Sequence, residues 1–402
     1  MSGQKASEKQ PMKGIGLLGT KGHVENVYLK TSAQAMSAVG GNTGNLVFEH
    51  AVYHMITEKK YIIGDDIPWD MGAIREHCRV IVVPSANHIR EDFDLTPFVE
   101  FLDRVQLPLV FIGLGAQADN FEKSRFDLHP SILKLIDLVK ERAKMVSIRG
   151  HYTARVLNSF GIGNVKVTGC PSNFMNPDPL LPDRIAARLE GKMRSFITHG
   201  DEPWPLIKEK QDVEKLLATW TMAGAAMQSQ QSVPDFMEFI RRNNPYSATN
   251  VPESREEALR EALMPTATMD QFRDYLAAKL RVYFSVSQWM EDSSKYDFSL
   301  GLRLHGNMIA WQVGVPSLWL SHDSRTQELA NVMAVPNMNY LEFLEKCKTV
   351  SDAWACVKFD KEAYRRRRAD LARGLNTVLA SEDIKNNLHQ IYAPEPQHDP
   401  LG

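Results

Sequence analysis

The stretch Val80-Ile-Val-Val83, followed by Pro84-Ser-Ala-Asn-His88, is an uninterrupted apolar run that ends abruptly in polar residues. The same pattern recurs at Leu109-Val-Phe-Ile112 and at Met145-Val-Ser-Ile148, with helical patterns between the runs. A strand that is apolar along its whole length is typical of a parallel sheet, because helices cover both faces of such a sheet. The first third of the chain therefore predicts a parallel α/β fold.

The chain has 402 residues, which is too many for one ordinary hydrophobic core and suits two domains. The Pro-rich segment Asn176–Asp183 breaks regular structure and marks the boundary. We expect an N-terminal Rossmann-like domain at 12–175 and a C-terminal Rossmann-like domain at 184–335. A C-terminal helical segment and tail at 336–402 follows, and the stretch 201–292 has a mostly helical pattern.

Composition excludes several classes of protein. The 47 basic and 49 acidic residues give a net charge of −2, so no nucleic-acid partner is expected. Four scattered cysteines without a C-x-x-C pair argue against a disulfide scaffold or a structural zinc site. The polar N-terminus and the lack of a long apolar run indicate a cytoplasmic protein. The run Arg365–Arg368 reads as a solvated face that could touch anionic lipid, so peripheral contact with the inner face of a membrane stays open.

The segment Arg303-Leu-His-Gly306 is the main candidate for a site, because ligands bind outside the carboxyl ends of strands in open α/β sheets. It follows the predicted strand Phe298–Leu302. Arg303 offers a fork of donors for a carboxylate or phosphate, and His305, on the same side of an extended segment, suits proton transfer. Gly306 allows close approach of backbone at a helix N-terminus. Equally, Arg303 could pair with an acid and His305 with backbone.

Two further strand ends carry candidate residues. After the next strand, Asp323 and Ser324 could cap the helix Thr326–Met333, and Arg325 could share a pocket with Arg303. Arg149 follows the run ending at Ile148 and either reaches the interdomain cleft or forms a surface ion pair.

The loop Gly41-Asn-Thr-Gly-Asn45 precedes a predicted helix at Leu46–Lys59. Its backbone N–H groups could cradle an anion or a sugar, or it could be a plain loop with a capping Asn. It lacks the Lys-Ser/Thr ending of a P-loop, so an ATPase is not indicated.

Two other motifs are weak. The glycines of Gly14-x-Gly16-x-x-Gly19 lie within an apolar run and not after it, so they do not indicate a dinucleotide site. His50 and His54 have the spacing of a metal-binding pair on a helix, but no third ligand is apparent nearby. No metal is therefore assigned.

Together these pieces resemble the polysaccharide pyruvyl transferase family, in order and approximate spacing over most of residues 12–333. Where that family often has a paired-glycine loop, this chain has Pro84–His88. The matching segments are Gly41-x-x-Gly44-Asn45, Ser147-Ile-Arg149-Gly150, Val167-Thr-Gly-Cys-Pro-Ser172, Ser299-Leu-Gly-Leu-Arg303-Leu-His305-Gly306, Gly314-Val-Pro316 and Asp323-x-Arg325.

The resemblance implies two Rossmann-like domains facing across a cleft, similar to GT-B glycosyltransferases. It also implies transfer of pyruvate from phosphoenolpyruvate, as a cyclic ketal, onto a sugar of a polysaccharide or exopolysaccharide precursor. Phosphoenolpyruvate is then the donor substrate, no cofactor is needed, and the acceptor is a sugar or a lipid-linked saccharide. In the family the Arg-Leu-His trio is associated with phosphoenolpyruvate, a role we carry to Arg303, Leu304 and His305.

We expect Arg303 to bind the anion, His305 to act as the acid/base, and Arg149 or Arg325 to assist the phosphate. The expected substrate-binding set is Leu304, Gly306, Arg149, Asn42, Gly44, Asn45, Asp323, Ser324 and Arg325. Two alternatives remain: a GT-B-type glycosyltransferase that uses a nucleotide sugar, and a noncatalytic sugar-binding module on the same fold.

Overall fold

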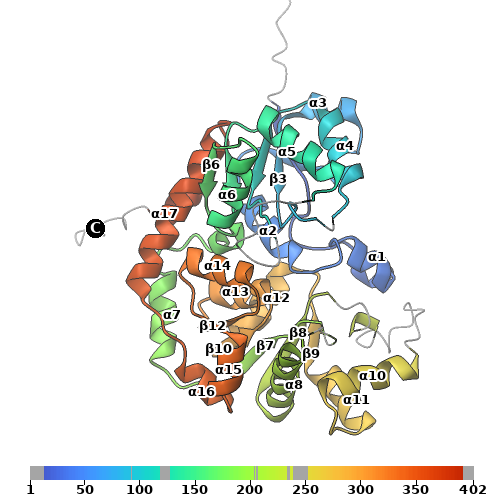
Figure 1. The fold of residues 1–402 in the computed structure, drawn as a ribbon, viewed down its shortest axis with the longest axis vertical. Helices are drawn as coiled ribbons and strands as arrows, with labels where there is room; N and C mark the ends of the chain where they lie inside the picture. Colours follow the sequence, from blue (N-terminus) through green and yellow to red (C-terminus); the bar gives the residue numbers. More distant parts are fainter. Residues whose placement is uncertain are drawn as a thin grey trace, which may run out of the picture.

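The computed structural model describes residues 13–91, 93–117, 127–202, 204, 207–232, 236–238 and 252–392, arranged as two α/β units stacked one above the other (Figure 1). The tail Pro394–Pro400, which the sequence predicts to fray, lies outside the described residues.

The N-terminal unit is built on a parallel sheet, as the apolar runs predict. Its strands, in spatial order, are β2 (Lys60–Ile62), β1 (Gly14–Leu17), β3 (Cys78–Pro84) and β4 (Leu109–Ile112). A bridge between Leu114 and Ile148 joins this sheet to the parallel pair β5 (Val146–Ile148) and β6 (Val165–Val167). Its helices are α1 (Ser32–Ser37), α2 (Asn45–Met55), α3 (Met71–His77), α4 (Thr96–Val105), α5 (Pro130–Arg142) and α6 (His151–Ser159).

The helix expected at Leu46–Lys59 is shorter than predicted. It ends at Met55, and the edge strand β2 follows at Lys60–Ile62, so residues 56–59 lead into the sheet and are not helical. The carbonyl of Lys59 already accepts a hydrogen bond from Ile15 N of the neighbouring strand at 2.9 Å. Pairing along the sheet therefore overrides the local helical pattern.

The C-terminal unit contains a second parallel sheet. Its strands, in spatial order, are β12 (Asn337–Asn339), β11 (Ser317–Ser321), β10 (Phe298–Gly301), β7 (Phe196–His199), β8 (Ala226–Gln230) and β9 (Leu280–Val282). The short edge strands β9 and β12 were not predicted. The helices are α8 (Lys208–Ala223), α10 (Glu253–Leu263), α11 (Met269–Ala278), α12 (Val286–Ser294), α13 (Leu304–Gln312), α14 (Ser324–Met333), α15 (Tyr340–Lys346) and α16 (Val350–Ala355).

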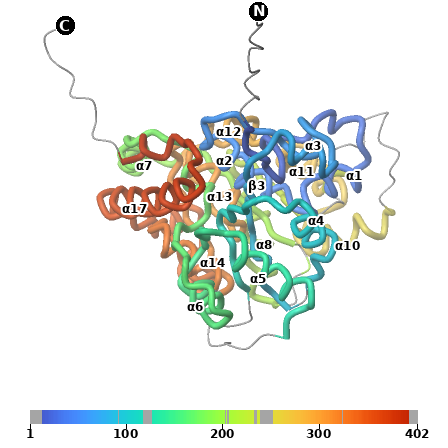
Figure 2. Tube along the Cα trace, turned by 90° about the horizontal axis from the view of Figure 1, so that it is seen from above, coloured from blue at the N-terminus to red at the C-terminus, as the bar shows by residue number. Residues whose placement is uncertain are grey.

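The long helix α17 (Lys361–Ala380) leads the chain from the C-terminal unit back to the N-terminal unit, and α7 (Leu181–Leu189) lies beside it in both views (Figures 1 and 2). Beyond α17, Thr57 N donates to Lys385 O and Asn387 N donates to Met55 O, each at 3.0 Å. A short 3-10 helix, η3 (Leu388–Ile391), packs against α17. The segment from Lys385 to Ile391 is thus part of the N-terminal unit.

One apolar cluster joins the two units. It contains Val52 of α2, Met308 of α13, Leu329 of α14 and Leu375 of α17, all buried. Side chains from both units interdigitate in this cluster, so burial of apolar surface holds the units in one relative position. The walls of any cleft between them are therefore set by a shared core.

Arg368 of α17 is buried, with 1% of its surface exposed. Its Nε donates to Asn173 O at 3.2 Å, its Nη1 donates to Asp178 O at 3.1 Å, and its Nη2 donates to Asn176 O. Those carbonyls belong to the segment that connects the units. The prediction that the arginine run is a solvated face is wrong at Arg368, because this position shares the buried face of α17 with Tyr364, one turn earlier.

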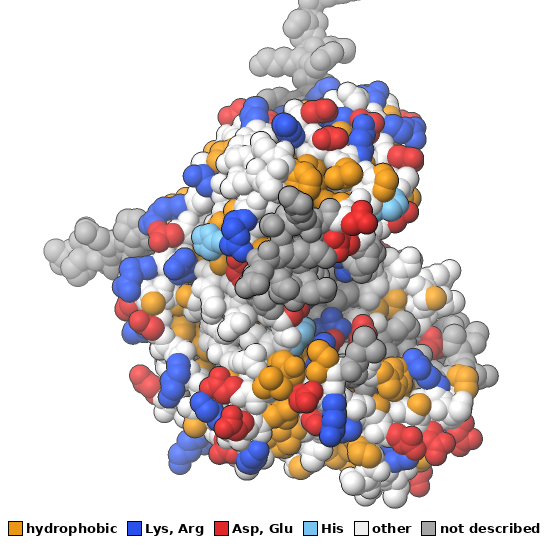
Figure 3. All heavy atoms as spheres, viewed as in Figure 1, with side chains coloured by type: hydrophobic (Ala, Val, Ile, Leu, Met, Phe, Trp, Pro, Cys, Tyr) orange, Lys and Arg blue, Asp and Glu red, His pale blue; other side chains and the backbone are white. Residues whose placement is uncertain are grey.

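No helix among the described residues is both long and apolar enough to cross a membrane. On the face shown in Figure 3, basic and acidic side chains are interspersed.

We expect Arg368→Met to lower the free energy of unfolding by about 3 kcal/mol or more, because it leaves buried carbonyls without a donor. Arg366→Met, at an exposed position of the same helix, should change it by less than about 0.5 kcal/mol. Urea unfolding followed by circular dichroism measures both. Equal stability of the two variants would contradict the role given to Arg368.

Candidate functional site

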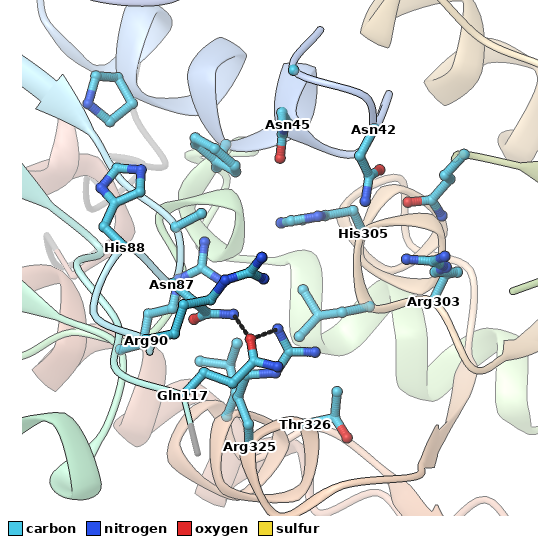
Figure 4. Close-up of a pocket in the computed structure, with 18 of the residues that line it drawn as sticks. Asn42, Asn45, Asn87, His88, Arg90, Gln117, Arg303, His305, Arg325 and Thr326 are labelled. Carbon is cyan, nitrogen blue, oxygen red and sulfur yellow. Dashed lines mark hydrogen bonds between the residues drawn. The ribbon is translucent and has the colours of Figure 1, made fainter. Parts of the chain in front are cut away.

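A cavity with a volume of about 520 Å³ lies between the units, where strand ends of both sheets meet (Figure 4). Its N-terminal wall comes from the loop and helix at 40–49, from 84–93 after β3, and from Gln117 and Arg149. Its C-terminal wall comes from Gln231 after β8, from 302–305 after β10, and from residues at 322–329 after β11. This is the position expected of a ligand site in parallel α/β sheets.

The structure brings most of the sequence-predicted residues into this cavity. Gly44, Gly306 and Asp323 lie behind the wall, and the backbone of Ser324 begins α14. The predicted residues on the wall are Asn42, Asn45, Arg149, Arg303, Leu304, His305 and Arg325.

Arg303 lies at the end of β10 and is the residue before α13, which begins at Leu304. The segment is therefore not extended through His305 as expected, although both side chains reach the cavity. The Arg303 guanidinium forms an ion pair with Asp201 and donates to Ser232 Oγ at 2.6 Å. The pairing with an acid, which the sequence left open, is thus present.

Asp201 is the centre of a buried charge network behind Arg303. Lys210 Nζ lies 2.5 Å from Asp201 Oδ2, and Asp201 N donates to Glu214 Oε1 at 2.9 Å. Burial raises the pKa of Asp201, but the charges of Arg303 and Lys210 outweigh it and lower the value to about 2. Burial and the Asp201 charge raise the pKa of Glu214 to about 8. Glu214 is thus the protonated partner, and Asp201 carries the negative charge.

Arg149 is buried, with 8% of its surface exposed. Its Nε donates to Gly113 O at 2.9 Å and its Nη2 donates to Ser85 O at 3.1 Å. Among the described residues no carboxylate lies within 4.0 Å of this guanidinium, so the surface ion pair that the sequence left open is not formed. Backbone dipoles orient the charge of Arg149, and an anion in the cavity could neutralise it.

His305 lies among the arginines. Its Nε2 is 3.6 Å from Cys170 Sγ, and its ring centroid is 5.7 Å from that of Phe48. Burial lowers the pKa of His305 to about 3, and the charges of Arg149, Arg325 and Arg303 add to this effect. The imidazole is therefore neutral near pH 7 while the cavity is empty of anion. An anion that neutralised those charges would raise this pKa.

Arg325 and Asn87 share a partner, since Gln117 Oε1 accepts from Arg325 Nη1 at 3.3 Å and from Asn87 Nδ2 at 3.4 Å (Figure 4). Arg325 Nη2 also donates to Asp323 Oδ2 at 3.3 Å. Asp323 accepts from Thr326 N at 2.7 Å, which confirms that it caps α14. Asp323 therefore positions Arg325 and does not itself line the cavity.

The glycine loop does not cradle a ligand with its backbone, contrary to one expectation. Thr43 N donates to Gln231 O and Gly44 N donates to Asn42 Oδ1, both at 2.8 Å. These donors are already used, so the Asn42 and Asn45 side chains are what face the cavity. A Cβ on Gly44 would lie 2.9 Å from His305 Nδ1, which explains the glycine.

Gly306 also serves packing and not ligand approach. A Cβ there would lie 2.3 Å from Nδ1 of the buried His199, whose ring is held by Ser229 Oγ at 2.7 Å and Ser299 Oγ at 3.0 Å.

Among the ionisable residues of the cavity wall, sequence reasoning missed four: Glu49, His88, Arg90 and His322. His88 and Arg90 follow β3, so their place after a buried strand was a usable signal. Glu49 lies one helical turn after Asn45 on α2 and offered no such signal. Burial raises the pKa of Glu49 to about 7, although hydrogen bonds from Thr20 oppose the shift.

The weak motifs have structural roles. A Cβ on Gly14 would lie 2.6 Å from Lys59 O, so this glycine allows close strand packing. His50 packs against His54 with ring centroids 4.1 Å apart, and its Nδ1 lies 3.3 Å from Lys21 O. Within the part of the chain that the structure describes, no three His, Cys, Asp or Glu side chains are grouped to hold a metal ion.

Two units, each built on a parallel sheet, enclose a cavity rich in arginine and histidine, and this two-unit α/β fold is the one that the sequence predicted. The family model described as polysaccharide pyruvyl transferase matches residues 42–324, and this chain belongs to that family. No protein of curated function shows a significant sequence match to it.

Solved structures with a similar chain path include several nucleotide-sugar epimerases. S. aureus MnaA, in a co-structure with UDP, is 14% identical, with 91% of this chain and 97% of that chain covered and a TM-score of 0.41. UDP-GlcNAc 2-epimerase from Neisseria meningitidis, bound to UDP-GlcNAc, is 11% identical, with 91% and 100% covered and a TM-score of 0.42. A putative UDP-N-acetylglucosamine 2-epimerase from Listeria monocytogenes is 11% identical, with 93% and 99% covered and a TM-score of 0.44.

We expect Gly306→Ala to destabilise the protein by roughly 1–3 kcal/mol, because the new methyl group overlaps a histidine that cannot move. Thermal unfolding measures the effect. Gly163→Ala is the control, since a Cβ there would meet only Asn158 Oδ1 at 3.7 Å. Unchanged stability of Gly306→Ala would show that His199 is free to shift.

Proposed function

We propose that this protein transfers pyruvate from phosphoenolpyruvate onto two hydroxyls of a sugar, forming a cyclic ketal and releasing phosphate. The observation that carries the proposal is the buried guanidinium of Arg149, which lacks a carboxylate partner among the described residues and lies on the wall of the cavity beside His305. Membership of the polysaccharide pyruvyl transferase family supports the same reaction.

Phosphoenolpyruvate carries a carboxylate and a phosphate, so it needs more than one cationic partner. Asp201 largely neutralises Arg303, whereas Arg149 is held by carbonyls and Arg325 contacts an amide and one carboxylate. We therefore assign the strongest anion contacts to Arg149 and Arg325. Arg303 and Leu304 complete the donor site, with Arg303 fixed in place by its ion pair.

The proposed transfer conserves all atoms and protons of the two substrates. One sugar hydroxyl adds to C2 of phosphoenolpyruvate while C3 takes up a proton and becomes a methyl group. Phosphate then leaves C2 with its bonding electron pair and one proton, and the second hydroxyl closes the ketal. The two protons lost by the hydroxyls equal those gained by C3 and phosphate.

His305 is the group we assign to moving these protons. A neutral imidazole can accept a proton from the acceptor hydroxyl and pass it on. Donor binding places negative charge beside it, so the pKa of His305 rises from its value of about 3. The protonated form therefore becomes accessible only in the presence of donor.

We expect phosphoenolpyruvate to raise the melting temperature, since a ligand at 100 times its Kd stabilises the native state by about 2.7 kcal/mol. Arg149→Met should weaken donor binding by about tenfold or more, because it removes a charged donor from the cavity. Arg155→Met is the control, at an exposed position on α6. Thermal-shift titration measures all three proteins.

Nucleotides and nucleotide sugars belong in the same titration. If these compounds stabilised the protein and phosphoenolpyruvate did not, the result would indicate a glycosyltransferase that uses a nucleotide sugar. Binding of phosphoenolpyruvate without turnover on any saccharide would instead indicate a noncatalytic homologue.

We expect His305→Ala to lose about 10²- to 10⁴-fold in turnover while phosphoenolpyruvate still stabilises it. Because donor binding raises the pKa of His305, wild-type binding should take up protons, and donor affinity should fall as pH rises through the bound-state pKa. Calorimetry in two buffers of different ionisation enthalpy measures this uptake. An active His305→Ala enzyme, or equal proton uptake by the variant, would contradict the assignment.

A further inference from the structure

The N-terminal unit carries a second cavity, separate from the donor site, with a volume of about 630 Å³. It lies between the segment 19–30 and the segment 63–69, and Lys21, His23, Asp66 and Trp69 are among its lining residues. We call it the trough.

Trp69 is exposed yet held in a fixed orientation. It is 61% exposed, and its ring packs edge-on against Phe101 with centroids 5.0 Å apart. Its Nε1 also lies over Gly64, where a Cβ would be only 2.5 Å away and the φ of +102° favours glycine. A rigid aromatic face loses little conformational entropy when a ligand stacks on it.

The trough is lined by charged groups of both signs, the two lysines Lys21 and Lys30 and the three acids Glu25, Asp65 and Asp66. Lys21 Nζ and Asp66 Oδ1 form an ion pair at 2.8 Å, and Asp66 Oδ2 accepts from Ile62 N at 2.8 Å. Asp65 and His23 are exposed around them. Such a surface offers hydrogen-bond donors and acceptors, and its charges nearly cancel, with one more acid than lysine. It suits a neutral polyhydroxylated ligand, whereas the arginine-rich donor site suits an anion.

The side chain of Glu49 connects the wall of the donor cavity to the edge of the trough. Glu49 lines the donor cavity, and its Oε2 accepts from Thr20 N at 2.9 Å and from Thr20 Oγ1 at 2.7 Å. Thr20 in turn lines the trough. The hydrogen bonds between Thr20 and Glu49 therefore place the two cavities next to each other at this point.

We propose that the trough binds the acceptor saccharide through sugar units beyond the one that reacts, with the apolar face of one pyranose ring stacked on Trp69. The acceptor is then an oligosaccharide or a longer chain, and not a monosaccharide. This inference rests on the proposed function for the reacting end of the acceptor, but the trough itself can bind saccharide without donor.

The first experiment measures binding without phosphoenolpyruvate. The probes are gluco-, galacto- and manno-oligosaccharides of one to six units, and the method is ligand-observed NMR with calorimetry for the binders. We expect affinity to rise with chain length in at least one series, and Trp69→Ala to reduce the affinity of the longest binder about tenfold. Tyr28→Ala, which removes another exposed aromatic ring that does not line the trough, should have no effect.

Trp69→Phe should restore part of the affinity, since it retains an aromatic face. In a transfer assay with saturating phosphoenolpyruvate, Trp69→Ala should raise the KM for the long acceptor while leaving kcat within about twofold, because the ring does not touch the reacting atoms.

Failure to bind any probe, affinity that does not depend on chain length, or equal behaviour of Trp69→Ala and Tyr28→Ala would each overturn the trough proposal. Stabilisation by phosphoenolpyruvate alongside any of these results would leave the donor assignment standing. Conversely, Trp69-dependent saccharide binding without any response to phosphoenolpyruvate would support the trough and count against pyruvyl transfer.

Discussion

The cleft depends on the way α17 locks the connecting segment between the two units. The guanidinium of Arg368 is buried and donates to the carbonyls of Asn173, Asn176 and Asp178. Tyr364, one turn earlier, donates from its hydroxyl to Asn173 Oδ1 at 2.9 Å. These bonds satisfy an irregular stretch of backbone that would otherwise be buried without partners. The same helix contributes Leu375 to the core shared by both units, so it helps to position one wall of the cavity relative to the other.

The arginines of the cleft differ in how far neighbouring groups neutralise them, and the less neutralised ones favour an anionic ligand. Arg303 has Asp201 as a partner, and Lys210 and Glu214 complete the network behind it. Arg149 has only carbonyl acceptors among the described residues, and it depresses the pKa of His305 together with Arg325 and Arg303. A dianionic or trianionic ligand would relieve repulsion among these groups and make the imidazole protonatable. In the proposed function, donor binding and proton transfer are coupled through the same arginines.

Glu49 lies where the two cavities approach each other. On one side it lines the donor cavity, and on the other it is held by Thr20 at the edge of the trough. The two cavities differ in chemistry, since one is rich in arginine and the other combines three acids, two lysines and an exposed tryptophan. This division matches a reaction between a small anion and a large neutral saccharide. The sequence around Glu49 gave no signal that this residue lines the cavity, since it lies within an ordinary helical pattern.

The amino-acid sequence by itself determined the parallel α/β class and the residues at the strand ends. A strand buried on both faces is mostly apolar, and polar residues follow its carboxyl end, so strands at Val80–Val83 and Phe298–Leu302 could be predicted from the sequence; the structure has them as β3 (Cys78–Pro84) and β10 (Phe298–Gly301). It also identified Arg149, Arg303, His305 and Arg325, now found around one cavity. Only the tertiary structure decided which arginine is neutralised, since Asp201 reaches Arg303 from a distant part of the chain. Only the tertiary structure showed that Gly44 and Gly306 are needed for close packing and that Asp323 positions Arg325. Steric contacts and ion pairs between distant segments leave no periodic pattern in the sequence.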